Sequence, residues 1–148
     1  MHSEFDRIRV GTLDDARDAA KAAATIIPIP ASSIYDGNDV DQWNRRAHNF
    51  LTGIALHAAY TLQDVDKIIA EIEMLPEDAI RSMFKRIQYT KHDPELLCGW
   101  LNDHNEPTAV HPIVFRSMTT MLRRPTNEFG SVLSTVKMYF WKAQQPDH

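Results

Sequence analysis

The chain has 148 residues, of which 43% are hydrophobic and 24% are charged, so it is long enough and apolar enough to fold as one domain around a core. Its formal net charge of −4 argues against a dedicated nucleic-acid-binding protein, because such proteins usually carry a basic excess. The single cysteine, Cys98, excludes an internal disulfide and indicates a reducing compartment.

Apolar residues recur at helical spacing along most of the chain, and Pro, Asp, Asn and Thr separate the helical segments. The predicted helices cover residues 13–24, 39 or 41 to 60, 62–75, 77–89, 94–103, 112–123 and 127–142. The connections between them are mostly short. The sequence therefore predicts an all-α fold, a compact bundle of about seven helices.

Local sequence patterns predict where two of the helices start and which helix is the most buried. Thr61 with Asp64 resembles a capping box for the helix over 62–75. Asp93 followed by Pro94 is typical of a cap with proline at the first helical position, which favours a helix over 94–103. Residues 50–60 are apolar almost all round, so the second helix is expected to be central and buried.

The sequence contains no motif for catalysis or phosphate binding. It has no Gly-Lys pair, so a Walker-type phosphate loop is absent, and it has no Gly-x-Gly-x-x-Gly pattern. Residues 130–134 lack the second glycine of a nucleophile elbow. We therefore expect this chain to have no enzymatic activity, no catalytic residue and no cofactor of its own.

The histidines do not form a pattern that is typical of a metal site. His48 and His57 are nine residues apart, which places them on roughly opposed faces of one helix. His92, His104 and His111 are spread over loops and helix ends. Zinc sites need clustered ligands, so we expect exposed or capping histidines and no metal site.

Charge is unevenly distributed, and residues 61–80 are strongly acidic. This stretch contains one lysine, Lys67, and six acidic residues. The acidic residues are Asp64, Asp66, Glu71, Glu73, Glu77 and Asp78. We predict that this cluster attracts a basic peptide by charge complementarity, with Trp100 as an aromatic anchor. The alternatives are a solvated acidic surface and a Trp100 that belongs to the core.

Basic residues gather further along the chain and offer an alternative partner surface. They are Arg81, Lys85, Arg86, Arg123 and Arg124. Such a group can contact the phosphates of a nucleic acid, in which case binding falls steeply as salt rises.

Three stretches form an ordered set of motifs. Residues 5–12 read FDRIRVGT, residues 43–60 read WxxRAHNFLTGIALHAAY, and HPIV at 111–114 is followed by EFGSVLST at 128–135. Together they resemble type IV secretion system coupling proteins of the TraG/TraD type (VirD-like ATPases). In that family a Trp precedes a helix ending in His-x-x-Tyr, and Glu-x-x-Ser-Val-Leu-Ser-Thr follows. The resemblance covers nearly the whole chain, but Phe129-Gly130 departs from the more usual aliphatic-Ser pair.

The resemblance implies a membrane-anchored hexameric ATPase whose RecA-like motor is interrupted by a cytosolic all-α domain. Residues 1–148 would be that inserted domain, with 1–11 and 143–148 as arms towards the motor. The Walker A loop would precede residue 1 and the Walker B strand would follow residue 148, so ATP and Mg would belong to the motor.

The resemblance also implies a function. The family's all-α domain is implicated in receiving secreted effector proteins or relaxase–DNA complexes at the cytoplasmic face of the bacterial inner membrane, where other secretion components assemble. We therefore expect a domain that recruits translocation signals. The alternative is a DNA-contacting domain that guides single-stranded DNA to the motor during conjugation. The isolated domain is expected to be soluble, since no apolar run reaches the ~18–20 residues of a membrane span and no signal peptide is evident. It is also expected to be a monomer, because hexamerisation in the family rests largely on the motor and membrane parts.

Overall fold

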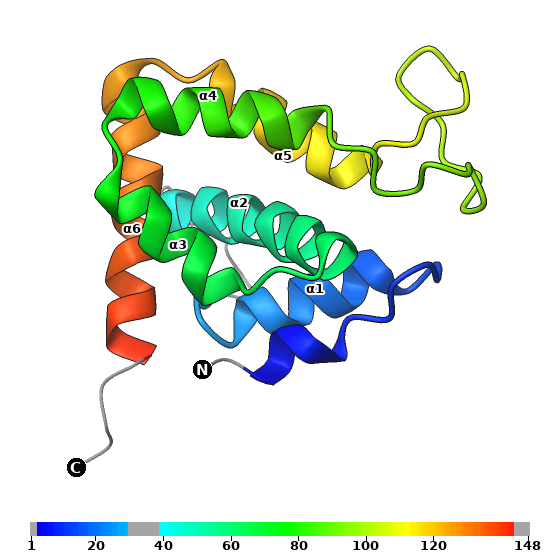
Figure 1. Cartoon of the computed structure of the whole chain (residues 1–148). Coiled ribbons are helices and arrows are strands. Elements are labelled where there is room, and N and C mark those ends of the chain that lie inside the picture. Colours follow the sequence, from blue (N-terminus) through cyan, green and yellow to red (C-terminus); the bar gives the residue numbers. More distant parts are fainter. Residues whose placement is uncertain (1–2, 30–38, 144–148) are drawn as a thin grey trace.

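The computed structural model describes residues 3–29 and 39–143, and within these ranges it is helical (Figure 1). A short 3-10 helix, η1 (Ser3–Arg7), precedes six α-helices, and the described residues form no strand beyond one antiparallel bridge between Leu101 and Pro107. The α-helices are α1 (Asp15–Ala24), α2 (Asp39–Thr61), α3 (Val65–Met74), α4 (Glu77–Gln88), α5 (Pro112–Leu122) and α6 (Thr126–Ala143). The predicted all-α bundle is confirmed, with six of its seven predicted helices.

The longest helix, α2, runs through the centre of the fold. Every residue from Phe50 to Ala58 is buried, and α1, α5 and α6 all pack against α2 (Figure 1). Gly53 allows α5 to approach closely, since a Cβ at this position would overlap the side chain of Ser117. The prediction that the second helix is central and buried is therefore confirmed. No helix in the described part of the chain is long and apolar enough to cross a membrane.

The start of α3 differs from the prediction. Leu62 adopts a left-handed backbone conformation (φ 59°) that ends α2, and its side chain is 94% exposed. The cap of α3 is Asp64, whose Oδ1 accepts a hydrogen bond from the Asp66 N–H at 2.9 Å. Thr61 instead donates its hydroxyl to the carbonyl of His57 within α2. The capping box at Thr61 was wrong because a capping residue must be free of the preceding helix.

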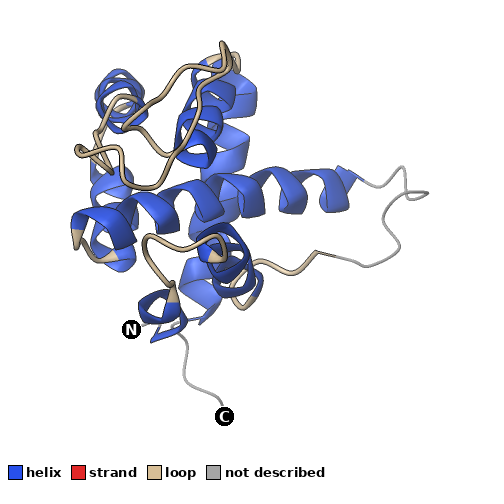
Figure 2. Cartoon of the chain, turned by 90° about the vertical axis from the view of Figure 1, so that its right-hand side faces the viewer, coloured by secondary structure: helices blue, strands red, loops and turns tan. Residues whose placement is uncertain are grey.

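The helix predicted over 94–103 is wrong, and this segment is part of a loop between α4 and α5. The carboxylate of Asp93 accepts hydrogen bonds from the backbone N–H groups of Leu97 (3.1 Å) and Cys98 (2.7 Å). Leu96 and Gly99 adopt positive φ angles, which an α-helix does not allow. The cap at Asp93 therefore organises turns rather than a helix. Figure 2 shows this loop at the end of the molecule that faces the viewer.

Residues 3–11, which the resemblance implies to be an arm, pack against the bundle. Phe5 and Ile8 are buried, and the Phe5 ring stacks on Phe140 of α6 with a centroid separation of 6.5 Å. The second implied arm, 143–148, lies outside the described residues apart from Ala143. The role of both segments as arms stays a prediction.

Candidate functional site

A groove of about 540 Å³ lies between η1, the C-terminal half of α2 and the start of α3. Its apolar lining includes Val10 and Leu62, whose side chains are 47% and 94% exposed. Asp6, Asp64 and Asp66 line the same groove, and none of its described lining residues is basic. We call it the acidic groove. It offers an apolar floor that is bordered by negative charge.

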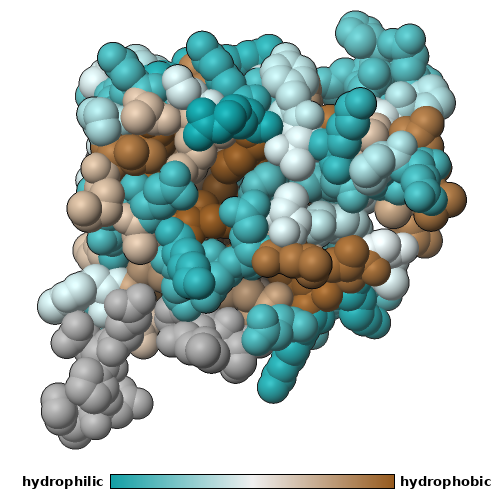
Figure 3. Space-filling view, viewed as in Figure 1, coloured by the Kyte–Doolittle hydropathy of each residue, from teal (hydrophilic) through white to brown (hydrophobic). Residues whose placement is uncertain are grey.

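The acidic groove continues along α3. A second hollow, of about 330 Å³, shares Leu62 and Asp64 with it and extends past Lys67 to Glu71. Glu71 and Lys67 are both exposed. On the face drawn in Figure 3, hydrophobic side chains form a band near the position of the C-terminal end of α2 in Figure 1, with hydrophilic side chains above and below it.

The structure places only part of the predicted acidic cluster at this groove. Asp64, Asp66 and Glu71 line it, whereas Glu73 and Asp78 are exposed and line neither hollow. Glu77 lies elsewhere, with its Oε2 accepting hydrogen bonds from Arg81 Nε at 2.8 Å and from the Thr126 hydroxyl at 3.1 Å.

The predicted basic residues do not form one surface. Arg81 donates to the carbonyls of Leu122 (3.2 Å) and Arg124 (2.9 Å), and its guanidinium lies over the Phe129 ring at 4.1 Å. These contacts tie α4 to the turn between α5 and α6. The side chain of Arg124 is 15% exposed. The remaining three are exposed: Lys85, Arg86 and Arg123.

Trp100 lies away from the acidic groove, beside a buried cluster of polar side chains. Its ring is 4.5 Å from the His111 ring and 5.4 Å from the Tyr60 ring, centroid to centroid. The side chain is partly buried. The interpretation of Trp100 as an anchor for the acidic surface has no support from this geometry, and its contacts fit the core alternative.

This cluster centres on three histidines, His57, His92 and His111, that are far apart in the sequence. His57 Nδ1 and His92 Nε2 are 3.0 Å apart, and His92 Nδ1 accepts a hydrogen bond from the backbone N–H of His111 at 3.0 Å. His111 caps α5, since its Nδ1 accepts from the Ile113 N–H, and its Nε2 lies 2.9 Å from Asp15 Oδ2. The three imidazoles join α2 and the α4–α5 loop to the starts of α5 and α1.

The hydrogen bonds fix the tautomers of these rings. Since His92 Nδ1 accepts, its proton is on Nε2, which donates to His57 Nδ1. Burial lowers the pKa of His57 to about 4. Burial, together with the charges of His57 and His111, lowers the pKa of His92 to about 3. Both rings are therefore neutral near pH 7.

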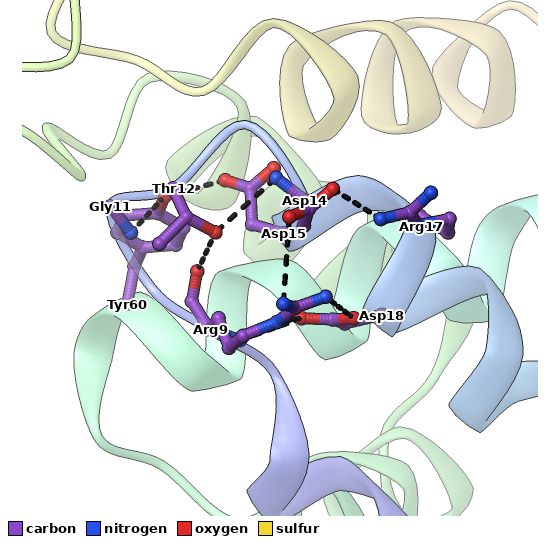
Figure 4. A network of polar contacts seen from close by, with 8 residues as sticks. All are labelled: Arg9, Gly11, Thr12, Asp14, Asp15, Arg17, Asp18 and Tyr60. Carbon is purple, nitrogen blue, oxygen red and sulfur yellow. Dashed lines mark hydrogen bonds and ion pairs between the residues drawn. The ribbon is translucent and has the colours of Figure 1, made fainter.

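Asp15 and Tyr60 extend this network to the N-terminal segment (Figure 4). The Tyr60 hydroxyl donates to Asp15 Oδ2 at 2.5 Å and accepts from the Gly11 N–H at 2.8 Å. Burial raises the pKa of Asp15, but hydrogen bonds from His111 and Tyr60 outweigh it, so the net shift is downwards. Nearby, Arg9 Nε and Asp18 Oδ2 form an ion pair at 2.8 Å that holds residues 8–11 against α1.

The expectation of exposed or capping histidines was correct for His104 and His111 and wrong for His48, His57 and His92, which are buried. The spacing of His48 and His57 correctly indicated different helix faces. This spacing carries no information about His92, which lies in the α4–α5 loop. No group of three or more His, Cys, Asp or Glu side chains in the described ranges is arranged to hold a metal ion. The cluster is a hydrogen-bonded network that positions the loop.

The chain is therefore a helical domain with a buried imidazole network and a separate acidic groove. Nearly its whole length is similar to part of conjugal transfer protein TraG of Escherichia coli. Two such proteins are 28% and 29% identical to it in alignments that are 152 positions long and cover 96% of this chain. The chain spans about a fifth (20%) of the length of these relatives. No family profile and no solved structure matches it. The similarity supports a relationship to TraG.

Proposed function

We propose that this chain is the substrate-recruiting helical domain of a conjugation-related coupling protein, and that it holds a basic, amphipathic translocation signal in the acidic groove. The similarity to proteins named for conjugal transfer supports a conjugation-related role. The acidic groove supports recruitment, and its combination of apolar floor and acidic border is the observation that carries the proposal.

Exposed apolar and acidic side chains would supply the affinity of the groove for such a signal. Val10 and Leu62 offer apolar area that a partner side chain can cover, and this burial supplies affinity in rough proportion to its area. Asp6, Asp64 and Glu71 give the groove a negative potential that favours Lys and Arg in the partner and speeds their encounter. Signals that order on binding suit such a groove, because an amphipathic segment can place one face on the floor.

The proposal extends to the longer protein of which this domain would be a part. That protein would supply a motor with ATP and Mg and would be anchored in the bacterial inner membrane. Effector proteins or relaxase complexes would be its substrates.

A titration followed by NMR tests recruitment directly. The titrants are C-terminal segments of proteins that are encoded beside this chain's gene, with single-stranded DNA as the comparison. We expect saturable binding of a basic segment, with shifts at residues 6–10 and 62–71 and weaker binding at higher salt. Binding of DNA alone would contradict the proposal and favour the DNA-contacting alternative.

Matched charge variants locate the site. Asp64→Asn together with Glu71→Gln removes two charges from the groove, and asparagine still caps α3. The control pair, Glu73→Gln with Asp78→Asn, removes two exposed charges outside it. We expect the first pair to weaken binding several-fold and the control pair to leave it nearly unchanged. Equal loss in both pairs would show a diffuse acidic surface rather than this groove.

A further inference from the structure

A second cavity, of about 430 Å³, lies between α1, α2 and α5 and shares no lining residue with the acidic groove. Figure 1 shows α1 and α5 on either side of α2. Small side chains of α1, Ala16 and Ala20, form part of its wall and leave the space open. Polar and basic side chains of α2 and α5 supply much of the remaining lining.

The cavity is basic in a chain whose net charge is negative. Arg46, Arg116 and Arg124 all line it, and no described lining residue is acidic. Asn49 and Thr120 lie in the same lining, so an amide and a hydroxyl accompany the three guanidinium groups. We call it the arginine cavity.

The guanidinium groups are incompletely paired with acidic side chains. Arg46 lies over the Trp43 ring at 4.7 Å, and within residues 3–29 and 39–143 it forms no ion pair; the same is true of Arg116. Arg124 Nη1 is 3.5 Å from Glu128 Oε1, at the long end of an ion pair. Its Nε is buried and has no acceptor in the described part of the chain.

Like charges are close together here. Burial, and then the positive charge of Arg46, lower the pKa of Arg124. Bringing two cations together costs stability, and an anion placed between them relieves this repulsion. A phosphoryl group fits best, because the guanidinium fork matches the spacing of phosphate oxygens and donates two parallel hydrogen bonds.

We propose that the arginine cavity is a binding site for a phosphoryl group, held by Arg46, Arg116 and Arg124. Asn49 and Thr120 complete the hydrogen bonding. The group can come from free phosphate or from a nucleic-acid backbone, since both present the same oxygens. The site is independent of the proposed recruitment in the acidic groove.

The test is an NMR titration of the whole chain with inorganic phosphate and pyrophosphate, and separately with a short oligothymidylate. We expect saturable shifts at Asn49, Thr120 and the three arginine side chains. Arg46→Gln and Arg116→Gln should each weaken binding by about tenfold, as expected when a charge-assisted hydrogen bond is lost. Neither side chain is buried, so both variants should fold.

The controls are Arg45→Gln and Arg17→Gln, exposed arginines next to the cavity residues Arg46 and Ala16 in sequence but outside its lining. They should leave the affinity unchanged. If the oligonucleotide shifts the same residues and displaces phosphate, the phosphoryl group that this cavity binds comes from a nucleic acid. If only phosphate or pyrophosphate gives saturable shifts at these residues, the phosphoryl group comes from a free anion. The proposal is overturned if millimolar phosphate and the oligonucleotide give no saturable shifts at these residues, or if the control variants weaken binding as much as Arg46→Gln does.

Discussion

His57 and His92, 35 residues apart in sequence, are joined ring to ring by a hydrogen bond of 3.0 Å between His57 Nδ1 and His92 Nε2. This bond, together with the one from the His111 N–H to His92 Nδ1, needs both rings to be neutral. A proton added to His57 Nδ1, or to His92 Nδ1, would place a second donor against a group that already donates. The histidines therefore couple the packing of the α4–α5 loop to pH.

The first prediction concerns stability as a function of pH. Both folded pKa values, about 4 for His57 and about 3 for His92, lie below the ordinary value of 6.5. At a pH between the folded value and 6.5, the unfolded chain therefore binds more protons than the folded chain does. The free energy of unfolding should be highest above pH 6.5 and fall as the pH drops towards 4. Between pH 7 and pH 5 we expect a loss of roughly 2 kcal/mol from each ring, about 4 kcal/mol together, measured by urea unfolding.

Below the histidine range, Asp15 acts in the same direction. Its pKa is lowered in the fold, so its stabilisation is present above the unfolded value of 3.8 and is lost as the pH falls further. The control is His104→Asn, which changes an exposed histidine and should leave the pH profile unaltered. A profile that stays flat from pH 7 to pH 5 would show that the buried rings do not resist protonation.

The second prediction concerns Tyr60→Phe. The variant removes the hydroxyl that donates to Asp15 and accepts from Gly11, so the free energy of unfolding should fall by about 1–3 kcal/mol. The pKa of Asp15 should rise, because the hydrogen bond from Tyr60 helps to keep it low. Thermal unfolding and a carboxyl titration by NMR measure the two effects. Tyr89→Phe, at a 67% exposed ring, is the control and should change neither.

The third prediction compares two glycines in helices. Gly53→Ala would place a methyl group onto the side chain of Ser117 and should destabilise the fold by about 1–3 kcal/mol through overpacking. Gly130→Ala meets nothing within 4 Å and should stabilise α6 by about 0.5–1 kcal/mol through helix propensity. Opposite signs in chemical denaturation are expected. A neutral Gly53→Ala would mean that α2 and α5 are not in close contact there.

The fourth prediction separates a structural arginine from exposed basic residues. Arg81→Gln loses hydrogen bonds to Glu77 and to two backbone carbonyls as well as the contact with Phe129, and should cost about 2–3 kcal/mol of stability. Arg86→Gln, at an exposed position of the same helix, should stay within about 0.5 kcal/mol. Similar small effects of both changes on unfolding would contradict the structural role of Arg81.

Local sequence determined the helices wherever the pattern was long and strongly periodic. The buried α2 and the approximate ends of α4, α5 and α6 follow from apolar spacing together with proline or acidic residues at the starts. The pattern was not sufficient over 94–103, because a capping carboxylate such as Asp93 satisfies the backbone of a turn as readily as that of a helix.

The candidate sites were predictable only in part for the same reason. Composition showed that residues 61–80 are acidic, and helical periodicity fixed which side chains share a face of α3. Only the tertiary structure brought η1 beside the start of α3, which put Asp64 and Asp66 in one groove with the exposed Val10. Glu73 lies outside this groove. The tertiary structure alone brought Asp15, His57, His92 and His111 together, from four separate parts of the chain. Spacing along one helix is a local property, whereas burial and hydrogen-bond partners depend on which distant segments pack against it.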